Sequence, residues 1–263
     1  MSTPITASDQ DLRALAAIVS RDRADLPDGE GLPPSLFADL KDQICCDEIC
    51  LHGFDSGRQK SSVLQIIPAL DDDLPGGFEG YEDWDRVHWE HYWDCQPCSY
   101  PDRTGDLHSV VTITDFYSAR QWHSIGMYSD IYRPQGYEHE LMLTLPAQPG
   151  PVSGPGRTLR LFFLRGSGLD FSERDRAVLT LLRPHLHQAY LDTERRRHPV
   201  PRLTARQNDL LQLVAAGHTN IQIARRLGIS EGTVRTHLEN IYERLQVSSR
   251  TAAVTRALAD RIA

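Results

Sequence analysis

The amino-acid sequence predicts an α+β domain with a central antiparallel sheet, followed by a smaller domain made of helices alone. The net charge of the 263-residue chain is -8, yet nine Arg and only five acidic residues lie between Pro201 and Ala263. Alternating, strand-like runs occur up to about residue 166, whereas helical spacing continues to the end. We therefore expect a first domain in residues 1–170, a connecting helix and Pro-containing linker in residues 171–199, and a second domain in residues 200–263.

The composition is typical of a protein that folds in water. Hydrophobic residues make up 40% and charged residues 24% of the chain, which argues against disorder of the whole chain. No apolar run approaches the roughly 18 residues of a membrane-spanning helix, and the first ten residues lack the pattern of a signal peptide. We therefore expect a cytoplasmic protein without membrane contact.

The first domain contains helices and strands in an order that does not alternate. Helical patterns cover residues 9–20, 35–43, 81–93 and parts of 117–132, and strand patterns cover residues 48–54, 61–68, 110–116, 139–147 and 157–166. Residues 55–60, DSGRQK, have the composition of a hairpin loop. The segment QPCSYPDRTGDL, residues 96–107, is expected to be irregular. This order is typical of an α+β fold and not of repeated βαβ units.

The segment that begins at Ser172 is the clearest helix in this part of the chain. Ser172 and Asp175 have the spacing of a capping box, Pro184 is expected to kink the helix, and Pro199 and Pro201 end it. Apolar residues recur at helical spacing on one face, at Leu179, Leu182, Leu186 and Ala189. This face either packs against the domain's own sheet or pairs two copies of the chain, and both alternatives stay open.

Four short helices fill the last domain. Thr204, Thr219 and Ser230 have the residue type and position of helix N-caps. In the third helix an apolar stripe consists of Val234, Leu238, Ile241 and Leu245. The opposite face carries Gly232, Thr236, Glu239, Asn240 and Glu243, with Thr233 and Arg235 beside them. Its small and polar N-terminal half suits the major groove of DNA, so the second and third helices form a predicted helix-turn-helix.

Residues 203–258 strongly resemble the LuxR-type (GerE family) DNA-binding domain of bacterial transcription regulators, and the run IARRLGISEGTVRTHLENIYERL is highly specific. In that family the third helix reads the major groove. The fourth helix, here SRTAAVTRAL, helps to pair two domains over an inverted repeat. The resemblance implies that Arg235, Thr236 and Glu239 occupy the base-contacting positions.

The three side chains suit base contacts to different degrees. Arg235 can donate two hydrogen bonds to a guanine or can hold a phosphate, and both roles stay open. Thr236 can touch a thymine methyl group or a polar base edge. Glu239 repels phosphate and fits only as an acceptor for a cytosine amino group. The family often has a basic residue at this position, so the target sequence stays open.

Seven further residues are candidates for contacts with the DNA backbone, because they offer hydroxyl, amide or cationic donors. They are Thr204, Asn220, Arg225, Arg226, Thr233, His237 and Arg250. For Arg225, Arg226 and Arg250 the alternative is a solvated helix face. His237 lies at the edge of the apolar stripe, so its alternative is a structural role.

The element order of the first domain resembles that of GAF- or PAS-like sensors, and CSYPDRTGD and DFYSARQWHSIGMYS resemble stretches of actinobacterial regulators with this architecture. Of the 20 Phe, Trp and Tyr residues, 13 lie between Phe78 and Tyr137. Such a concentration predicts either a packed core under the sheet or a pocket for a flat or apolar small molecule. The candidates for the pocket wall are Trp89, Trp93, Phe116, Trp122 and Tyr128.

All five cysteines lie in the first domain, and they are Cys45, Cys46, Cys50, Cys95 and Cys98. An odd number without a secretion signal favours reduced, buried thiols. The alternative is a metal or redox site, with Cys95, Cys98, His91 and Cys46 as candidate ligands. Because a single CxxC is a weak pattern, we expect no metal and no cofactor.

The sequence therefore predicts a DNA-binding transcription regulator and not an enzyme, since it has no nucleophile elbow, HExxH or dinucleotide motif. We expect a homodimer on double-stranded DNA with an inverted-repeat operator, its recognition helices in major grooves roughly 34 Å apart. A small-molecule effector is the expected signal, and RNA polymerase is a further candidate partner. The alternatives are a redox- or metal-responsive regulator that uses the cysteines, and a small-molecule enzyme fused to a DNA-binding domain.

Overall fold

The computed structural model describes residues 8–67, 80–147, 157–197, 203–245, 247 and 249–259. The chain divides into two compact units, Met1–Glu194 and Arg195–Ala263. The sequence predicts that residues 171–199 form a segment that connects the two domains. In the structure most of this segment, up to Glu194, belongs to the first unit. Among the described helices, none is long and apolar enough to span a membrane.

A five-stranded antiparallel sheet forms the centre of the first unit. Its strands are β1 (Glu48–Asp55), β2 (Lys60–Ile67), β3 (Val110–Thr112), β4 (His139–Pro146) and β5 (Arg157–Arg165), in the order β2-β1-β5-β4-β3. The five predicted strand positions are confirmed. The third strand is shorter than predicted because the Asp115 carboxylate accepts from the Thr112 N–H at 2.7 Å, and a 3-10 turn, η1 (Ile113–Asp115), begins there.

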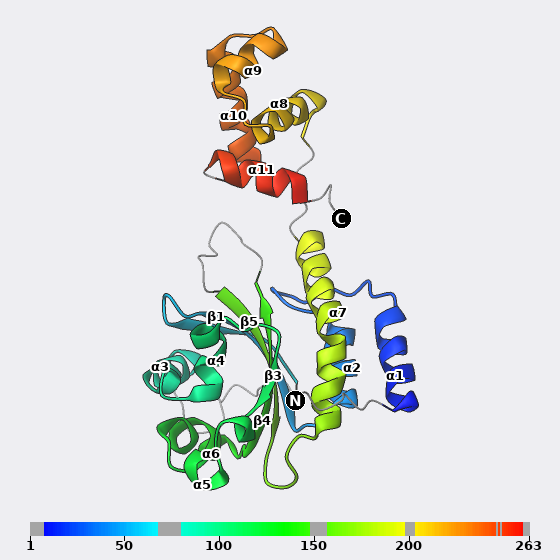
Figure 1. Cartoon of the computed structure of the whole chain (residues 1–263), viewed down its shortest axis with the longest axis vertical. Coiled ribbons are helices and arrows are strands. Elements are labelled where there is room, and N and C mark those ends of the chain that lie inside the picture. Colours follow the sequence, from blue (N-terminus) through cyan, green and yellow to red (C-terminus); the bar gives the residue numbers. More distant parts are fainter. Residues whose placement is uncertain are drawn as a thin grey trace. The chain divides into compact units, whose positions relative to one another are not determined.

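Three helices cover one face of the sheet, and Figure 1 shows them together on that side. They are α1 (Asp9–Ser20), α2 (Pro34–Gln43) and α7 (Glu173–Arg197). The core beneath them is aliphatic and includes Ile49, Leu51, Leu141, Leu143, Leu159, Leu161 and Phe163 from the strands. The Ser8 hydroxyl and the Asp11 carboxylate form a capping box at the start of α1.

The opposite face is covered by a second set of elements with an aromatic core (Figure 1). These elements are α3 (Tyr81–Tyr92), α4 (Gln96–Thr104), α5 (Ala119–Trp122), the π-helix η2 (Tyr128–Tyr132) and α6 (Arg133–Gln135). The prediction that residues 96–107 are irregular is wrong for α4. Pro97 lies in the first turn, where a missing N–H costs no helical hydrogen bond, and Gly105 ends the helix in the left-handed region at φ 72°.

The leucine face of α7 packs against the sheet. Leu179, Leu182 and Leu186 are fully buried in the aliphatic core, and Ala189 is partly buried beside them. The alternative in which this face pairs two copies is therefore wrong for the three leucines. The predicted capping box is present, since the Asp175 N–H donates to the Ser172 hydroxyl at 3.3 Å, and the helix continues past Pro184 to Arg197.

The second unit contains the four predicted helices, namely α8 (Ala205–Ala215), α9 (Asn220–Leu227), α10 (Glu231–Leu245) and α11 (Arg250–Ala259). Thr204 and Thr219 form capping boxes with Gln207 and Gln222. The four predicted residues of the α10 stripe, from Val234 to Leu245, are buried in its core.

We expect Leu182→Ala to destabilise the first unit by about 2–5 kcal/mol, because the change leaves a cavity in the core between α7 and the sheet. The matched control is Leu181→Ala on the same helix, where 39% of the side chain is exposed and a change within about 0.5 kcal/mol is expected. Denaturant unfolding of the full chain measures both. Equal effects of the two substitutions would contradict this packing of α7.

Candidate functional site

A cavity of about 70 Å³ lies in the first unit, on the aromatic face of the sheet. The strands contribute Glu48, Cys50, His52, Glu140, Arg160 and Phe162 to its wall. The covering elements contribute Tyr81, Trp84, His88, Tyr132, Gln135 and Tyr137. A cavity of this size can hold several water molecules or a small organic molecule.

Three rings on α3 form one wall of the cavity. The Tyr81 and Trp84 rings stack with their centroids 5.4 Å apart, and the Trp84 and His88 rings stack at 4.8 Å. Spacings of three and four residues place successive side chains on one helix face, so this wall follows from the phase of α3. Phe162 on β5 supplies a further ring from the sheet.

Two carboxyl groups reach the cavity from the strands on either side of β5. Glu48 and Glu140 are both cross-strand partners of Leu164, which places all three side chains in one row on one face of the sheet. The Tyr137 hydroxyl donates to Glu48 at 2.7 Å, and the Tyr132 hydroxyl donates to Glu140. Burial raises the pKa of both carboxyl groups, to about 7 for Glu140.

Two buried histidines also line the cavity. Nδ1 of His52 and both ring nitrogens of His88 have no hydrogen-bond partner among the described residues. Burial lowers the pKa of His52 to about 3 and that of His88 well below its usual range, so both rings are neutral at pH 7. An unpartnered buried nitrogen is costly, so this wall offers hydrogen-bonding positions that a further group could use.

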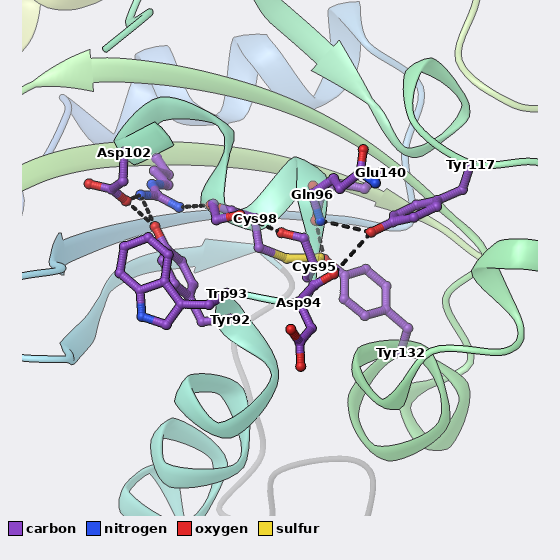
Figure 2. Close-up of a disulfide and its surroundings, with 12 residues drawn as sticks. Tyr92, Trp93, Asp94, Cys95, Gln96, Cys98, Asp102, Tyr117, Tyr132 and Glu140 are labelled. Carbon is purple, nitrogen blue, oxygen red and sulfur yellow. Dashed lines mark hydrogen bonds and ion pairs between the residues drawn. A yellow bond between two sulfur atoms is a disulfide. The ribbon is translucent and has the colours of Figure 1, made fainter. Parts of the chain in front are cut away.

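Arg160 is the buried cation of the site, and its charge is balanced within the protein. Its guanidinium group forms an ion pair with Asp102 at 2.7 Å and donates to the Tyr92 hydroxyl at 2.6 Å. It also donates to the carbonyl oxygen of Cys98 and lies 4.3 Å from the Phe54 ring centroid. Figure 2 shows Tyr92 and Asp102 converging on this network. These bonds join β5 to α3 and α4.

Cys95 and Cys98 form a disulfide at the start of α4 (Figure 2), so the expectation of reduced thiols is wrong for this pair. Their side chains are close because one helical turn separates them. Cys45, Cys46 and Cys50 are free, and burial raises the pKa of Cys46 to about 12, which keeps it a neutral thiol.

The structure does not bring the candidate metal ligands together. Cys95 and Cys98 are bonded to each other, and Nε2 of His91 lies 2.8 Å from the Asp130 carboxylate. In the described part of the chain, no three His, Cys, Asp or Glu side chains gather as a metal site would require. The proposed site with Cys46 and His91 as ligands is therefore not formed.

None of the five predicted wall residues lines the cavity. Trp89 is buried and donates from Nε1 to Asp85 at 3.0 Å, and Trp93 is 40% exposed. Phe116 packs on Tyr100, and Trp122 and Tyr128 pack on each other in the aromatic core. On α3 the wall residues are instead Tyr81, Trp84 and His88, one residue out of phase with Trp89 and therefore about 100° away around the helix.

The second unit presents the outer face of α10 to solvent. Ser230 caps this helix, since its hydroxyl accepts from the Thr233 N–H at 3.1 Å. Arg235, Thr236 and Glu239, the predicted base-contacting residues, are all exposed. Arg235 makes no hydrogen bond or ion pair with the described residues, so its guanidinium group is available to a ligand.

The residues predicted to contact the DNA backbone differ in exposure and in their bonds within the protein. Thr204, Arg225, Arg226 and Thr233 are exposed, and His237 is half-buried at the edge of the stripe. Arg250 donates to the Asn220 side chain at 3.0 Å and to the His218 carbonyl, which ties the start of α11 to the start of α9. Asn220 and Arg250 thus have a structural role in addition to the contacts predicted for them.

Comparison with known families gives a match for this second unit. Residues 201–257 match the family described as bacterial regulatory proteins, luxR family. They form a LuxR-type helix-turn-helix domain. The match covers the four helices described above except the end of α11, and it confirms the family resemblance predicted for this part of the chain.

Relatives of the LuxR-type domain are transcriptional regulators. The probable transcriptional regulatory protein SgaR of Hyphomicrobium methylovorum is 47% identical over 79 residues, which are 30% of this chain and 37% of SgaR. The putative HTH-type transcriptional regulator YhjB of Escherichia coli strain K12 is 53% identical over 51 residues, 19% of this chain and 26% of YhjB. The matched segment thus spans well under half of these relatives.

Two solved structures share the fold over most of the chain. The structure of SdiA in complex with octanoyl-rac-glycerol has a TM-score of 0.54 and covers 97% of this chain and 96% of its own. A structure of Escherichia coli SdiA also has a TM-score of 0.54, with coverage of 95% and 96%. Both are 16% identical to this chain, so the likeness concerns the fold alone.

We expect Glu140→Gln to stabilise the protein at high pH. The pKa of Glu140 is raised from its ordinary 4.5 to about 7 by burial, so the unfolded chain ionises first and stability falls as the pH rises through this window. The loss reaches about 3 kcal/mol above pH 8. Gln has no charge, so its advantage over Glu140 grows from pH 4.5 to pH 8 in urea unfolding curves.

Tyr132, Arg160 and Cys50 are the ionisable groups near Glu140, and both proteins contain them, so the difference between the two proteins isolates residue 140. Glu90→Gln serves as the control, because Glu90 lies on the exposed side of α3 in an ion pair with Arg86. A stability difference that does not change with pH would contradict the burial of an ionisable Glu140.

Proposed function

We propose that the chain is a DNA-binding transcription regulator that binds an inverted-repeat operator as a homodimer and responds to a small molecule in the cavity of its first unit. The observation that carries the proposal is the exposed, capped N-terminal half of α10 within the LuxR-type domain. Contacts with RNA polymerase belong to the same proposal. The five-stranded antiparallel sheet supports a GAF- or PAS-like sensor, and the actinobacterial type rests on the sequence resemblance alone.

Base recognition is assigned to three exposed side chains of α10. Arg235 offers two parallel N–H donors and has no competing partner within the described residues, so it suits guanine or a phosphate. Thr236 is already bonded through its hydroxyl to the Gly232 carbonyl at 3.2 Å, which leaves its methyl group for a thymine contact. Glu239 requires a cytosine amino group opposite it, because it repels the phosphates on either side.

Backbone contacts are assigned to the exposed members of the predicted set. Thr204, Arg225, Arg226 and Thr233 offer hydroxyl or guanidinium donors at helix ends of the LuxR-type domain. His237 is half-buried, and Arg250 donates a hydrogen bond to Asn220 on α9. Contacts of these two side chains with phosphate would use their remaining N–H donors. Such contacts position the domain and carry no sequence information.

The cavity is the proposed effector site. It brings buried, unpartnered nitrogen atoms and two carboxyl groups together under aromatic rings, which is the composition of a small-molecule site. The fold likeness to SdiA, one structure of which contains octanoyl-rac-glycerol, supports a ligand-binding role for such a fold. A bound effector would contact β1, β4 and β5 together with α3 and η2, and it would thereby stabilise the closed aromatic layer.

We expect Arg235→Ala to weaken operator binding by about 1–3 kcal/mol while leaving binding to random duplex unchanged, if the side chain reads guanine. A phosphate role predicts instead an equal loss on both duplexes and a shallower salt dependence. Fluorescence anisotropy with operator and random duplexes at several salt concentrations separates the two roles. Arg244→Ala, at the exposed C-terminal end of the same helix, is the matched control, and no change on either duplex would contradict both roles of Arg235.

The disulfide favours one second candidate function, a redox-responsive regulator. Cys98 lines the cavity and its carbonyl oxygen accepts from Arg160, so opening the Cys95–Cys98 bond would act on the cavity wall. Redox control predicts that reduction with dithiothreitol, which yields two thiols and the cyclic disulfide of the reagent, changes operator affinity. A Cys95→Ser/Cys98→Ser variant should then match the reduced protein and no longer respond to dithiothreitol. Unchanged affinity in both experiments would remove this candidate.

A further inference from the structure

One end of the cavity carries two buried carboxyl groups without an ion-pair partner among the described residues. Glu48 and Glu140 lie in one row with Leu164, and each accepts a hydrogen bond from a tyrosine hydroxyl. Neither carboxyl group forms an ion pair with any residue that the structure describes. Glu48 has a second hydrogen bond, with the Cys50 thiol. A carboxylate has two oxygens and about four acceptor sites, so both groups can accept further hydrogen bonds from a ligand.

The cations near these carboxyl groups are engaged elsewhere. Arg160 is paired with Asp102 at 2.7 Å and donates to Tyr92 and Cys98. Lys41 lies close enough to favour the charged form of Glu48, but its ammonium group donates to the backbone carbonyls of Asp47 at 2.8 Å and Ile67 at 3.2 Å. Both cations favour the charged carboxylates from a distance, but neither forms an ion pair with them, so direct contact with a positive charge is left for a ligand to make.

Two buried carboxyl groups without an ion-pair partner in the described part of the chain are costly for the fold when they are ionised. Burial disfavours the charged form of a carboxyl group, and it raises the pKa of Glu140 although the Tyr132 hydroxyl and the charge of Arg160 act in the opposite direction. A hydrophobic residue or glutamine in the same place would avoid the cost. Groups that destabilise a fold gather at binding sites, where a ligand compensates for them.

Aromatic rings surround the two carboxyl groups. Tyr81 and Trp84 stack on one side, and Phe162, Tyr132 and Tyr137 line the remainder. The faces of aromatic rings attract cations as well as flat apolar groups. Carboxylates within an aromatic wall thus favour a ligand with a positive charge, and the rings favour a ligand with a flat group that can stack on them.

The neutral imidazoles fit the same kind of ligand. His52 lies on β1 four residues beyond Glu48, and His88 lies on α3 against Trp84. A neutral imidazole ring has one acceptor nitrogen and one donor nitrogen, so these rings can bind a hydroxyl or amino group at the other end of a ligand. They add no positive charge that would repel a cation, since burial lowers the pKa of both.

We propose that the cavity binds a small organic cation, a protonated amine attached to a flat aromatic body. The ammonium group lies at the Glu48 and Glu140 end and donates to both carboxylates, and the ring stacks against Trp84. The inference rests on the proposed function in one respect, namely that the cavity is the effector site. A carboxylate ligand is disfavoured by like charge at the same end, and a neutral ligand leaves that charge unbalanced.

The test uses the full chain and three probes that share a phenyl ring and differ in charge: 2-phenylethylammonium, 2-phenylethanol and phenylacetate. Isothermal titration calorimetry at pH 8 measures binding, and Trp fluorescence gives a second signal because Trp84 lies in the wall. We expect the ammonium probe to bind about tenfold or more tightly than the alcohol and phenylacetate not to bind. Equal binding of the ammonium and the alcohol would overturn the charge selection, and preferred binding of phenylacetate would overturn the proposal outright.

Glu140→Gln and Glu48→Gln should each lower the affinity for 2-phenylethylammonium by about tenfold and leave the affinity for 2-phenylethanol unchanged. Two separate variants are used so that a folding defect in one does not decide the result, and circular dichroism checks both. Glu90→Gln on the exposed side of α3 is the control and should bind as the unmodified chain does. Unchanged binding of the ammonium in both cavity variants would overturn the proposed site, as would the failure of all three probes at millimolar concentration.

Operator binding of the same samples separates this inference from the proposed function. Failure of the ammonium to bind while the operator is still bound would overturn the ligand class alone. Tight binding of the ammonium by a protein that binds no operator would support the ligand class and overturn the regulator. A change in operator affinity on adding the ammonium probe, absent in Glu140→Gln, would support both.

Discussion

The alternation of side chains along β5 is the constraint on which the first unit depends. Leu159, Leu161 and Phe163 enter the aliphatic core under α7, while Arg160 and Phe162 enter the cavity wall. Both faces of the sheet are covered, so a shift of β5 by one residue in register would place the Arg160 guanidinium group in the aliphatic core. The same shift would place the leucines of β5 in the cavity wall. The registers with β1 and β4 extend the same alternation to Glu48, His52 and Glu140.

Charge compensation divides the polar residues of the cavity into two kinds. Arg160 holds α3, α4 and β5 together through Asp102, Tyr92 and the Cys98 carbonyl, and its removal would leave the partly buried carboxylate of Asp102 without its cation. Glu48 and Glu140 are bonded to tyrosine hydroxyls, and Glu48 also to the Cys50 thiol, but neither has an ion-pair partner among the described residues, so neutral groups could replace them with a gain in stability. The first kind supports the fold, and the second kind lowers stability when ionised, which agrees with the proposed role of the cavity in ligand recognition.

Most helices and strands could be predicted from the sequence because their signals are local. Ser172 with Asp175, Thr204 with Gln207 and the stripe from Val234 to Leu245 act within a few residues, and the structure contains each of them. The helix α4 was missed because Pro97 and Pro101 suggest a loop, although the first turn of a helix tolerates Pro97 and the structure accommodates Pro101 inside this short helix. The disulfide was missed because an odd number of cysteines says nothing about two thiols one helical turn apart.

The two candidate sites also differ in how far local sequence signals determine them. The outer face of α10 is defined by the phase of one helix, so its exposed residues could be named individually from the 3.6-residue period. The cavity wall depends on which rings of α3 meet β1 and β5, and that is decided by packing between segments far apart in the chain. Composition located the aromatic region, but only tertiary contacts place Trp84 in the wall and Trp89 against Asp85. Sequence signals that could have indicated the wall were the glutamates at the ends of two strands, because a charged residue at an inward-facing strand position requires either a partner or a ligand.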